Sequence, residues 1–265
     1  MHRVVSTGDI TLQVIALYDR WEKTFWDHVN EDPLNYYHFI FDWKLRRDQT
    51  KILMAMEDDR IEGLMLIYRD YIVQLRGKRE AVKMLLDLLK LEKAELQAPL
   101  DCEDLVLAKY PSRKVKEEMI LMSLTKGNEN IQVTTAPTRL SVDDAEEVLE
   151  LMKKTDPSWW GEMELDNLRK TMQDSFWLGI KQDRTIVSVG MTRLVGFASN
   201  IGIAATKEEY RNKGYATSIV SELVREILTI SPTAIIHVIK GNAPAIRSYS
   251  KVGFKPYKTY LFIRT

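Results

Sequence analysis

The sequence predicts a mixed α/β (α+β) protein of two domains, each with a mixed central sheet flanked by helices. Strand-like and helix-like segments alternate through the C-terminal half, which is typical of such folds. The N-terminal half repeats this order more loosely. Between the halves, residues 124–141 are rich in glycine, asparagine and proline, which break regular structure. We therefore expect two domains, at residues 1–129 and 130–265.

The C-terminal half begins with two expected helices, at residues 140–154 and 159–174. Ser141 is followed three residues later by Asp144, an acidic variant of the capping box that starts helices. Apolar residues then recur at helical spacing. Three strands are expected next, at residues 175–182, 185–197 and 199–206.

The remaining C-terminal segments continue the alternation. A helix after the third strand carries Ala216, Ile219, Leu223 and Ile227 on one face. The segment that follows is nearly all apolar and β-branched, which indicates a buried strand. That strand covers residues 233–240, and a short helix over 242–253 and a last strand over 257–265 complete the half.

The N-terminal half has a comparable series of segments. An ancient duplication would explain this similarity, and chance agreement between two mixed α/β domains is the alternative. The expected helices are residues 11–29 and 78–90, and the expected strands are 50–57, 60–69, 70–77, 93–100 and 117–125.

The composition limits the classes of partner and compartment. Lysine and arginine number 38, as do aspartate and glutamate, so the net charge is +0 and favours neither a nucleic acid nor a membrane surface. The single cysteine, Cys102, excludes an intramolecular disulfide and favours a reducing compartment. No apolar run approaches the roughly 20 residues that span a bilayer, and the four histidines lack metal-ligand spacing. We expect a soluble cytoplasmic protein without a metal.

The stretch from Glu208 to Val224 contains the clearest chemical signal. It places Arg211, Lys213 and Gly214 directly before a helix and directly after a strand. Helix N-termini carry unpaired N–H groups and bind phosphate, and a glycine allows close backbone approach. The motifs of the P-loop and of the dinucleotide-binding fold are both missing from the sequence. The stretch therefore predicts a diphosphate cradle of another kind, although a solvated basic turn is the alternative.

Two motifs resemble those of the GNAT family of N-acetyltransferases. Residues 211–216, Arg-Asn-Lys-Gly-Tyr-Ala, are similar to the family signature R/Q-x-x-G-x-G/A. A second signature, N-x-x-A-x-x-x-Y-x-x-x-G-F, follows in family order after one helix and one strand. The resemblance covers about residues 131–265, and the tandem layout is loosely similar to that of glycine N-acyltransferase-like proteins. The second signature is matched by Asn242, Ala245, Tyr249, Gly253 and Phe254.

The resemblance implies a GNAT fold, acetyl-CoA as acyl donor and a primary amine as acceptor. In such folds the third strand splays from its neighbour, and the CoA arm pairs with the exposed edge. The amides of the signature hold the diphosphate, Asn242 contacts the arm, and Tyr249 faces the sulfur, which makes Tyr249 and Asn242 the catalytic candidates. The implied CoA-binding residues are Ile203, Ala204, Ala205, Thr206, Arg211, Asn212, Lys213, Gly214, Tyr215, Ala216, Asn242, Ala245 and Tyr249.

The acceptor side is defined less sharply by the sequence. Strand 199–206 carries no carboxylate that could relay a proton from the amine. Glu162 and Glu164 either attract a cationic amine or are surface charges. Trp159 and Trp160 either line the acceptor pocket or pack in the core. A small amine, an amino acid and a peptide N-terminus all fit as acceptors.

Two other functions fit the sequence. The first is a non-catalytic CoA-binding or sensing module on the same fold. The second is a scaffold protein, for which the aromatic segment 35–43 is the candidate surface. The N-terminal half has Arg76, Gly77 and Lys78 without the signature spacing. If that half is also GNAT-like, we expect it to have lost CoA binding.

Overall fold

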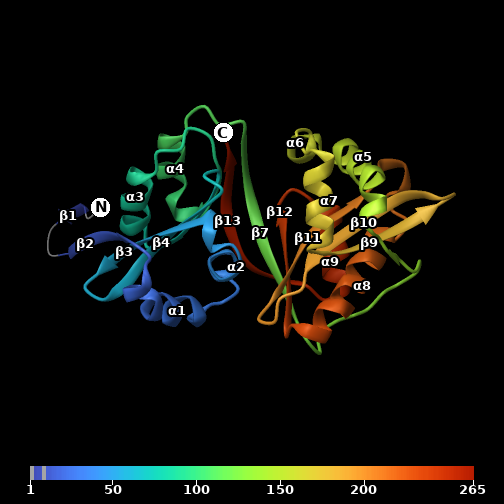
Figure 1. Ribbon diagram of the computed structural model, residues 1–265, viewed down its shortest axis with the longest axis horizontal. Helices are drawn as coiled ribbons and strands as arrows, with labels where there is room; N and C mark the ends of the chain where they lie inside the picture. Colours follow the sequence, from blue (N-terminus) through green and yellow to red (C-terminus); the bar gives the residue numbers. More distant parts are fainter. Residues whose placement is uncertain (1–2, 8–9) are drawn as a thin grey trace. The chain divides into compact units, whose positions relative to one another are not determined.

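The computed structural model describes residues 3–7 and 10–265, and the chain forms two compact units (Figure 1). The first unit comprises the chain up to Met119 together with Lys258–Thr265, and the second is Ile120–Tyr257. The last strand of the chain therefore ends in the first unit. The domain bounds 1–129 and 130–265 stay a prediction about which parts of the chain fold as units.

The first unit contains a mixed sheet in the strand order β1-β2-β3-β4-β5-β6-β13. Strands β1 to β5 are antiparallel neighbours, β5 and β6 are parallel, and β13 is antiparallel to β6. The elements are β1 (Arg3–Thr7), β2 (Ile10–Ala16), α1 (Glu22–Glu31), α2 (Tyr37–Leu45), β3 (Thr50–Glu57), β4 (Arg60–Tyr68), β5 (Ile72–Gly77), α3 (Arg79–Leu88), β6 (Glu95–Pro99), α4 (Glu103–Lys109) and β13 (Lys255–Arg264).

Two parts of the first unit differ from the sequence prediction. Residues 11–29 were expected as one helix, but β2 and α1 share this region. Strand β2 pairs with β1 on one side and with β3 on the other, so its backbone hydrogen bonds come from the sheet and not from a helix. The short helices α2 and α4 were not predicted. α2 is apolar almost all round, so it lacks the one-sided spacing that indicates a helix.

The aromatic segment 35–43 is not a free surface. Tyr37, Phe39, Ile40 and Trp43 of α2 are each at most 7% exposed. The scaffold function therefore loses the surface on which it depended.

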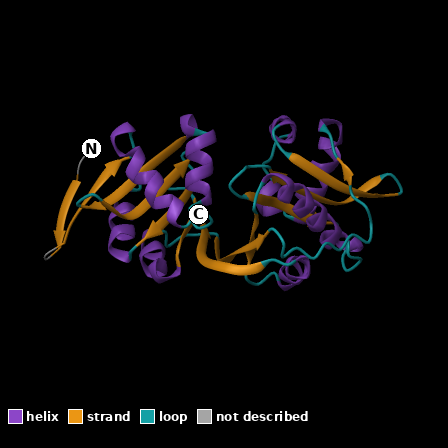
Figure 2. Cartoon of the chain, turned by 90° about the horizontal axis from the view of Figure 1, so that it is seen from below, coloured by secondary structure: helices purple, strands orange, loops and turns teal. Residues whose placement is uncertain are grey.

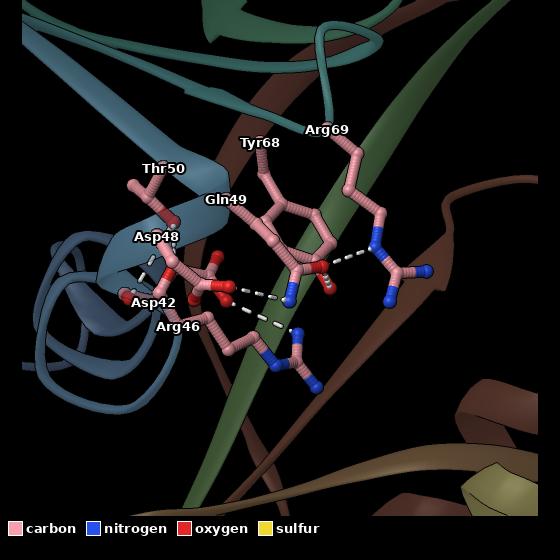
Figure 3. A network of polar contacts seen from close by, with 7 residues as sticks. All are labelled: Asp42, Arg46, Asp48, Gln49, Thr50, Tyr68 and Arg69. Atoms are coloured by element: carbon pink, nitrogen blue, oxygen red, sulfur yellow. Dashed lines mark hydrogen bonds and ion pairs between the residues drawn. The ribbon is translucent and has the colours of Figure 1, made fainter.

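A polar network fixes α2 to the sheet (Figure 3). Asp42 accepts from Arg46 at 3.1 Å, and the Thr50 hydroxyl donates to the Arg46 carbonyl at 2.8 Å. Arg69 Nε donates to Gln49 Oε1 at 2.7 Å. These bonds join the end of α2 to the start of β3 and to the turn after β4. The charges of this network therefore have a structural explanation.

The second unit matches the predicted order of segments closely. Its strand order is β7-β12-β11-β10-β9-β8, and helices flank the strands in both units (Figure 2). The two-residue strand β8 was not predicted. The elements are β7 (Val115–Thr125), β8 (Thr138–Arg139), α5 (Ala145–Thr155), α6 (Pro157–Trp160), α7 (Leu165–Gln173), β9 (Phe176–Gln182), β10 (Thr185–Arg193), β11 (Ser199–Thr206), α8 (Tyr215–Ile230), β12 (Thr233–Ile239) and α9 (Ala243–Val252).

Two hydrophobic cores stabilise the second unit. One joins α8 and α9 to the sheet and includes Ile219, Leu223 and Tyr249. The other joins α5 and α7 to the sheet and includes Val148 and Leu168. The sheet is thus covered by two separate helical layers. Across the described residues, no helix is long and apolar enough to cross a membrane.

Candidate active site

Strand β11 has a free edge over its second half. It pairs with β10 along almost its whole length. It pairs with the parallel strand β12 only through Ser199, Asn200 and Ile201. In the described sheet, residues 203–206 therefore have no strand partner on the β12 side. This is the splay that the sequence resemblance implied, and it leaves backbone groups available to an extended ligand.

A β-bulge at Gly202 accounts for the splay. Ile203 lies opposite Met191, whereas Ile201 lies opposite Thr192, so Gly202 is an extra residue on β11. A bulge bends its strand and increases the local twist. A side chain at Gly202 would approach the Met191 methyl group to 3.2 Å. β11 consequently turns away from β12 immediately after their last paired residues.

The segment between β11 and α8 forms a turn of unpaired amides. Asn212 and Gly214 both have positive φ, 65° and 82°. Helix α8 then begins, and the Ser218 amide donates to the Gly214 carbonyl at 2.9 Å. In the part of the chain that the structure describes, the amides of residues 212–217 donate to no protein acceptor. They open a helix of 16 residues, and such a terminus attracts anions.

The side chains of this turn add positive charge. Arg211 and Lys213 are both exposed, and the Lys213 ammonium lies 4.8 Å from the centre of the Tyr210 ring. Both charges add to the roughly half positive charge of the helix terminus. Gly214 needs its left-handed backbone, which other residues rarely adopt. The turn therefore has the charge and the open backbone of an anion site.

Helix α9 starts and ends with residues of the second motif. Asn242 Oδ1 accepts from the Ala245 amide at 3.2 Å, which caps the helix. Gly253 ends the helix at φ 114°, where a side chain would lie 2.4 Å from the Asn128 carbonyl oxygen. The Phe254 amide then donates to the Tyr249 carbonyl. Capping by Asn242 is observed, and its contact with a CoA arm stays a prediction.

Comparison with solved structures decides the fold. A Drosophila protein matches 97% of this chain and 98% of its own, with 13% identity and a TM-score of 0.68. A tandem GNAT protein from the clavulanic acid biosynthesis pathway matches 96% of this chain and 98% of its own, with 11% identity and a TM-score of 0.62. The chain has a tandem GNAT fold. The resemblance carried by the two motifs is thereby confirmed at the level of the fold.

Further comparisons agree with the GNAT fold. A GCN5-related N-acetyltransferase from Sphaerobacter thermophilus matches 95% of this chain and 95% of its own, with 12% identity and a TM-score of 0.58. The family model of the FR47-like protein matches residues 178–263. No curated protein matches the sequence. The looser similarity to glycine N-acyltransferase-like proteins is not confirmed.

Tyr249 lies within this GNAT unit in an apolar environment. It is 6% exposed, and its ring packs edge-on against Phe254 with centroids 6.3 Å apart. Burial raises the pKa of Tyr249 to about 12, so the hydroxyl stays protonated at neutral pH. Among the described residues, no group forms a hydrogen bond with this hydroxyl. Tyr249 therefore has a proton to donate and no protein acceptor that would hold it.

The two adjacent tryptophans occupy different environments. Trp160 packs against the α5–α7 core, together with Met163 and with Ile203 from the free edge of β11. Trp159 is 44% exposed. Glu162 and Glu164 are exposed as well. Core packing therefore accounts for Trp160, whereas a role for Trp159 and the two exposed glutamates on the acceptor side stays a prediction.

The N-terminal GNAT unit has a similar splay but no comparable turn. Its parallel strands β5 and β6 pair only up to Gln74 and Gln97. Only Lys78 lies between β5 and α3, and its amide donates to the Glu62 carbonyl at 2.9 Å. The connection is too short to form a loop of unpaired amides like the one before α8.

A buried arginine fills the splay of the N-terminal unit. Arg76 is 3% exposed and donates from Nη1 to the Leu75 carbonyl at 2.8 Å. Its Nη2 donates to the side-chain oxygens of Gln74 and Gln97. Its guanidinium stacks 3.9 Å from the centre of the Tyr260 ring. The Arg76 side chain thus occupies the splay and bonds the Leu75 carbonyl at the strand edge.

We expect one CoA site per chain, in the second unit, because among the described residues only that unit combines a free strand edge with unpaired amides. Isothermal titration of the intact protein with CoA should give a stoichiometry of one. The double variant Arg211→Ala, Lys213→Ala should weaken this binding about tenfold, since it removes two charges beside the diphosphate. Two equivalent sites in the wild-type protein would contradict the prediction.

Proposed function

We propose that the second unit binds acetyl-CoA and transfers its acetyl group to a primary amine. One observation carries the proposal: the free edge at residues 203–206 leads directly into the unpaired amides of residues 212–217. An extended amide-containing arm followed by a diphosphate fits this succession. CoA has these two parts in this order.

In this proposal the arm of CoA pairs with β11 as an added strand. Ile203, Ala204, Ala205 and Thr206 supply the backbone groups. The amides of the turn receive the diphosphate, with Arg211 and Lys213 beside it. The thioester end then extends along β11 toward Tyr249 and the start of α9.

The reaction consists of direct attack by the amine on the thioester carbonyl. A C–N bond forms, the C–S bond breaks, and the sulfur leaves as a thiolate. Tyr249 donates a proton or a hydrogen bond to that sulfur, because its hydroxyl is protonated at neutral pH. A cationic amine loses one proton to solvent before it attacks and a second after the C–N bond forms, and Tyr249 regains its proton from solvent. Glu162 and Glu164 would attract a cationic amine.

The experiment is a survey of amines with acetyl-CoA as donor. Release of free CoA is followed with a thiol reagent for small amines, amino acids and peptides with free N-termini. Turnover above the uncatalysed rate with any of these supports the proposal. CoA binding without turnover would favour the non-catalytic CoA-binding module, which is consistent with the missing carboxylate on β11.

A further inference from the structure

The linker, residues 126–137, connects β7 to β8. Part of it is hydrogen-bonded to α8 and α9. The Asn130 amide donates to the Val252 carbonyl at 2.8 Å. The Gln132 amide donates to Ser221 Oγ at 3.0 Å, and the Thr134 amide donates to Ser218 Oγ at 3.1 Å. These bonds hold Asn130 at the end of α9 and the backbone of residues 132–134 along the first turns of α8.

The hydroxyl of Ser218 has a defined hydrogen-bond arrangement. Ser218 is fully buried, and its Oγ accepts from the amides of Thr134 and Thr135 at 3.1 and 3.4 Å. A hydroxyl oxygen has two acceptor positions, and both are used. Its own hydrogen is therefore directed to Thr134 Oγ1, which lies 3.2 Å away. Thr134 Oγ1 accepts in that pair, so its own hydrogen is left to donate elsewhere.

Thr134 Oγ1 lies at the turn that opens α8. A Cβ atom built on Gly214 would be 3.1 Å from this oxygen. Apart from the neighbours of Gly214 in the chain, no other heavy atom of the described residues lies within 4 Å of that position. Thr134 is exposed. The open face of Gly214 is thus bordered by one hydroxyl group with a hydrogen to donate.

We propose that Thr134 donates a hydrogen bond to the diphosphate of CoA, and that Ser218 positions it. The inference rests on the proposed function, because it adds a residue from the linker to the CoA site of α8. Neither motif contains Thr134. The linker between β7 and β8 would then also form one wall of the diphosphate site.

The test compares three variants of the full chain by isothermal titration with CoA. Thr134→Val removes the hydroxyl at nearly constant volume and should weaken CoA binding about tenfold, the effect of one hydrogen bond to a charged group. Thr134→Ser keeps the hydroxyl and should bind within about threefold of wild type. Thr135→Val is the control, because only the Thr135 amide contacts Ser218, and it should bind as wild type does.

Each outcome decides a separate question. Equal losses in Thr134→Val, which lacks the hydroxyl, and in Thr134→Ser, which keeps it, would show that the hydroxyl does not account for the effect and would overturn the inference. CoA binding within threefold of wild type in Thr134→Val would also overturn it. Failure of the wild-type protein to bind CoA would instead contradict the proposed function. A tenfold loss confined to Thr134→Val supports the proposed hydrogen bond.

Discussion

Replacing Tyr249 by phenylalanine should lower kcat by about 100-fold or more, with little change in CoA affinity. The phenyl ring keeps the packing against Phe254, so the variant removes only the hydroxyl. A general acid contributes about 10²–10⁴ to the rate. Loss of kcat without loss of binding marks an interaction made mainly in the transition state. The measurement combines steady-state kinetics with a CoA titration of the same variant.

Tyr110→Phe is the matched control for this prediction. Tyr110 is also 6% exposed, but it lies in the first unit and donates to the Leu91 carbonyl. Its variant should lose some stability and keep its kcat. If Tyr249→Phe keeps kcat within about threefold of wild type, a difference of well under 1 kcal/mol, Tyr249 is a packing residue.

The raised pKa of Tyr249 also predicts the pH dependence of the rate. Because the pKa lies near 12, the hydroxyl stays protonated from neutral pH to about pH 10, the usual pKa of tyrosine. Ionisation of Tyr249 should therefore cause no decline in kcat over that range in wild type. A decline that disappears in Tyr249→Phe would contradict this assignment.

Replacing Gly214 by alanine should weaken CoA binding by about 100-fold. The added methyl group enters the open face beside Thr134 and keeps the diphosphate away from the amides. A loss of this size corresponds to one or two hydrogen bonds to a charged group. The left-handed backbone also makes alanine unfavourable by roughly 1–2 kcal/mol, so the melting temperature should fall as well.

Gly127→Ala separates these two effects. Gly127 also has positive φ, 92°, but a side chain there would meet no atom within 4 Å. The backbone cost should therefore be similar, without an effect on CoA. Loss of affinity in Gly214→Ala alone supports the diphosphate site. Equal affinity in the two variants would show that the diphosphate binds elsewhere.

Much of the second unit could be predicted from local sequence. Its helices have one apolar face, and its strands are bounded by clear turns. Gly214 and Gly253 could be recognised because both stand in the two motifs, and both have the positive φ that glycine adopts readily. The splay itself depends on the register between β10 and β11, which the local pattern does not contain. The bulge at Gly202 became visible only through that register.

The contacts that were not predicted are distant in sequence. Thr134 and Ser218 are 84 residues apart, and a single sequence shows no sign of their hydrogen bonds. In the sequence, Arg76 is a basic residue beside a glycine, with no sign of burial. In the structure it is buried and bonded to the side chains of Gln74 and Gln97. Helix α2 was missed because tertiary contacts bury six of its nine residues, so that its apolar side chains are not confined to one face. Packing between distant segments decided each of these cases.

Hydrogen–deuterium exchange of the intact protein with and without CoA tests the central claim most directly. The claim is that CoA occupies the free edge of β11 and the turn before α8. Saturating CoA should slow exchange at those amides of residues 203–206 that face away from β10 and at the amides of residues 212–217, and leave residues 72–77 of β5 unchanged. Protection of β5, or none at residues 212–217, would contradict the account.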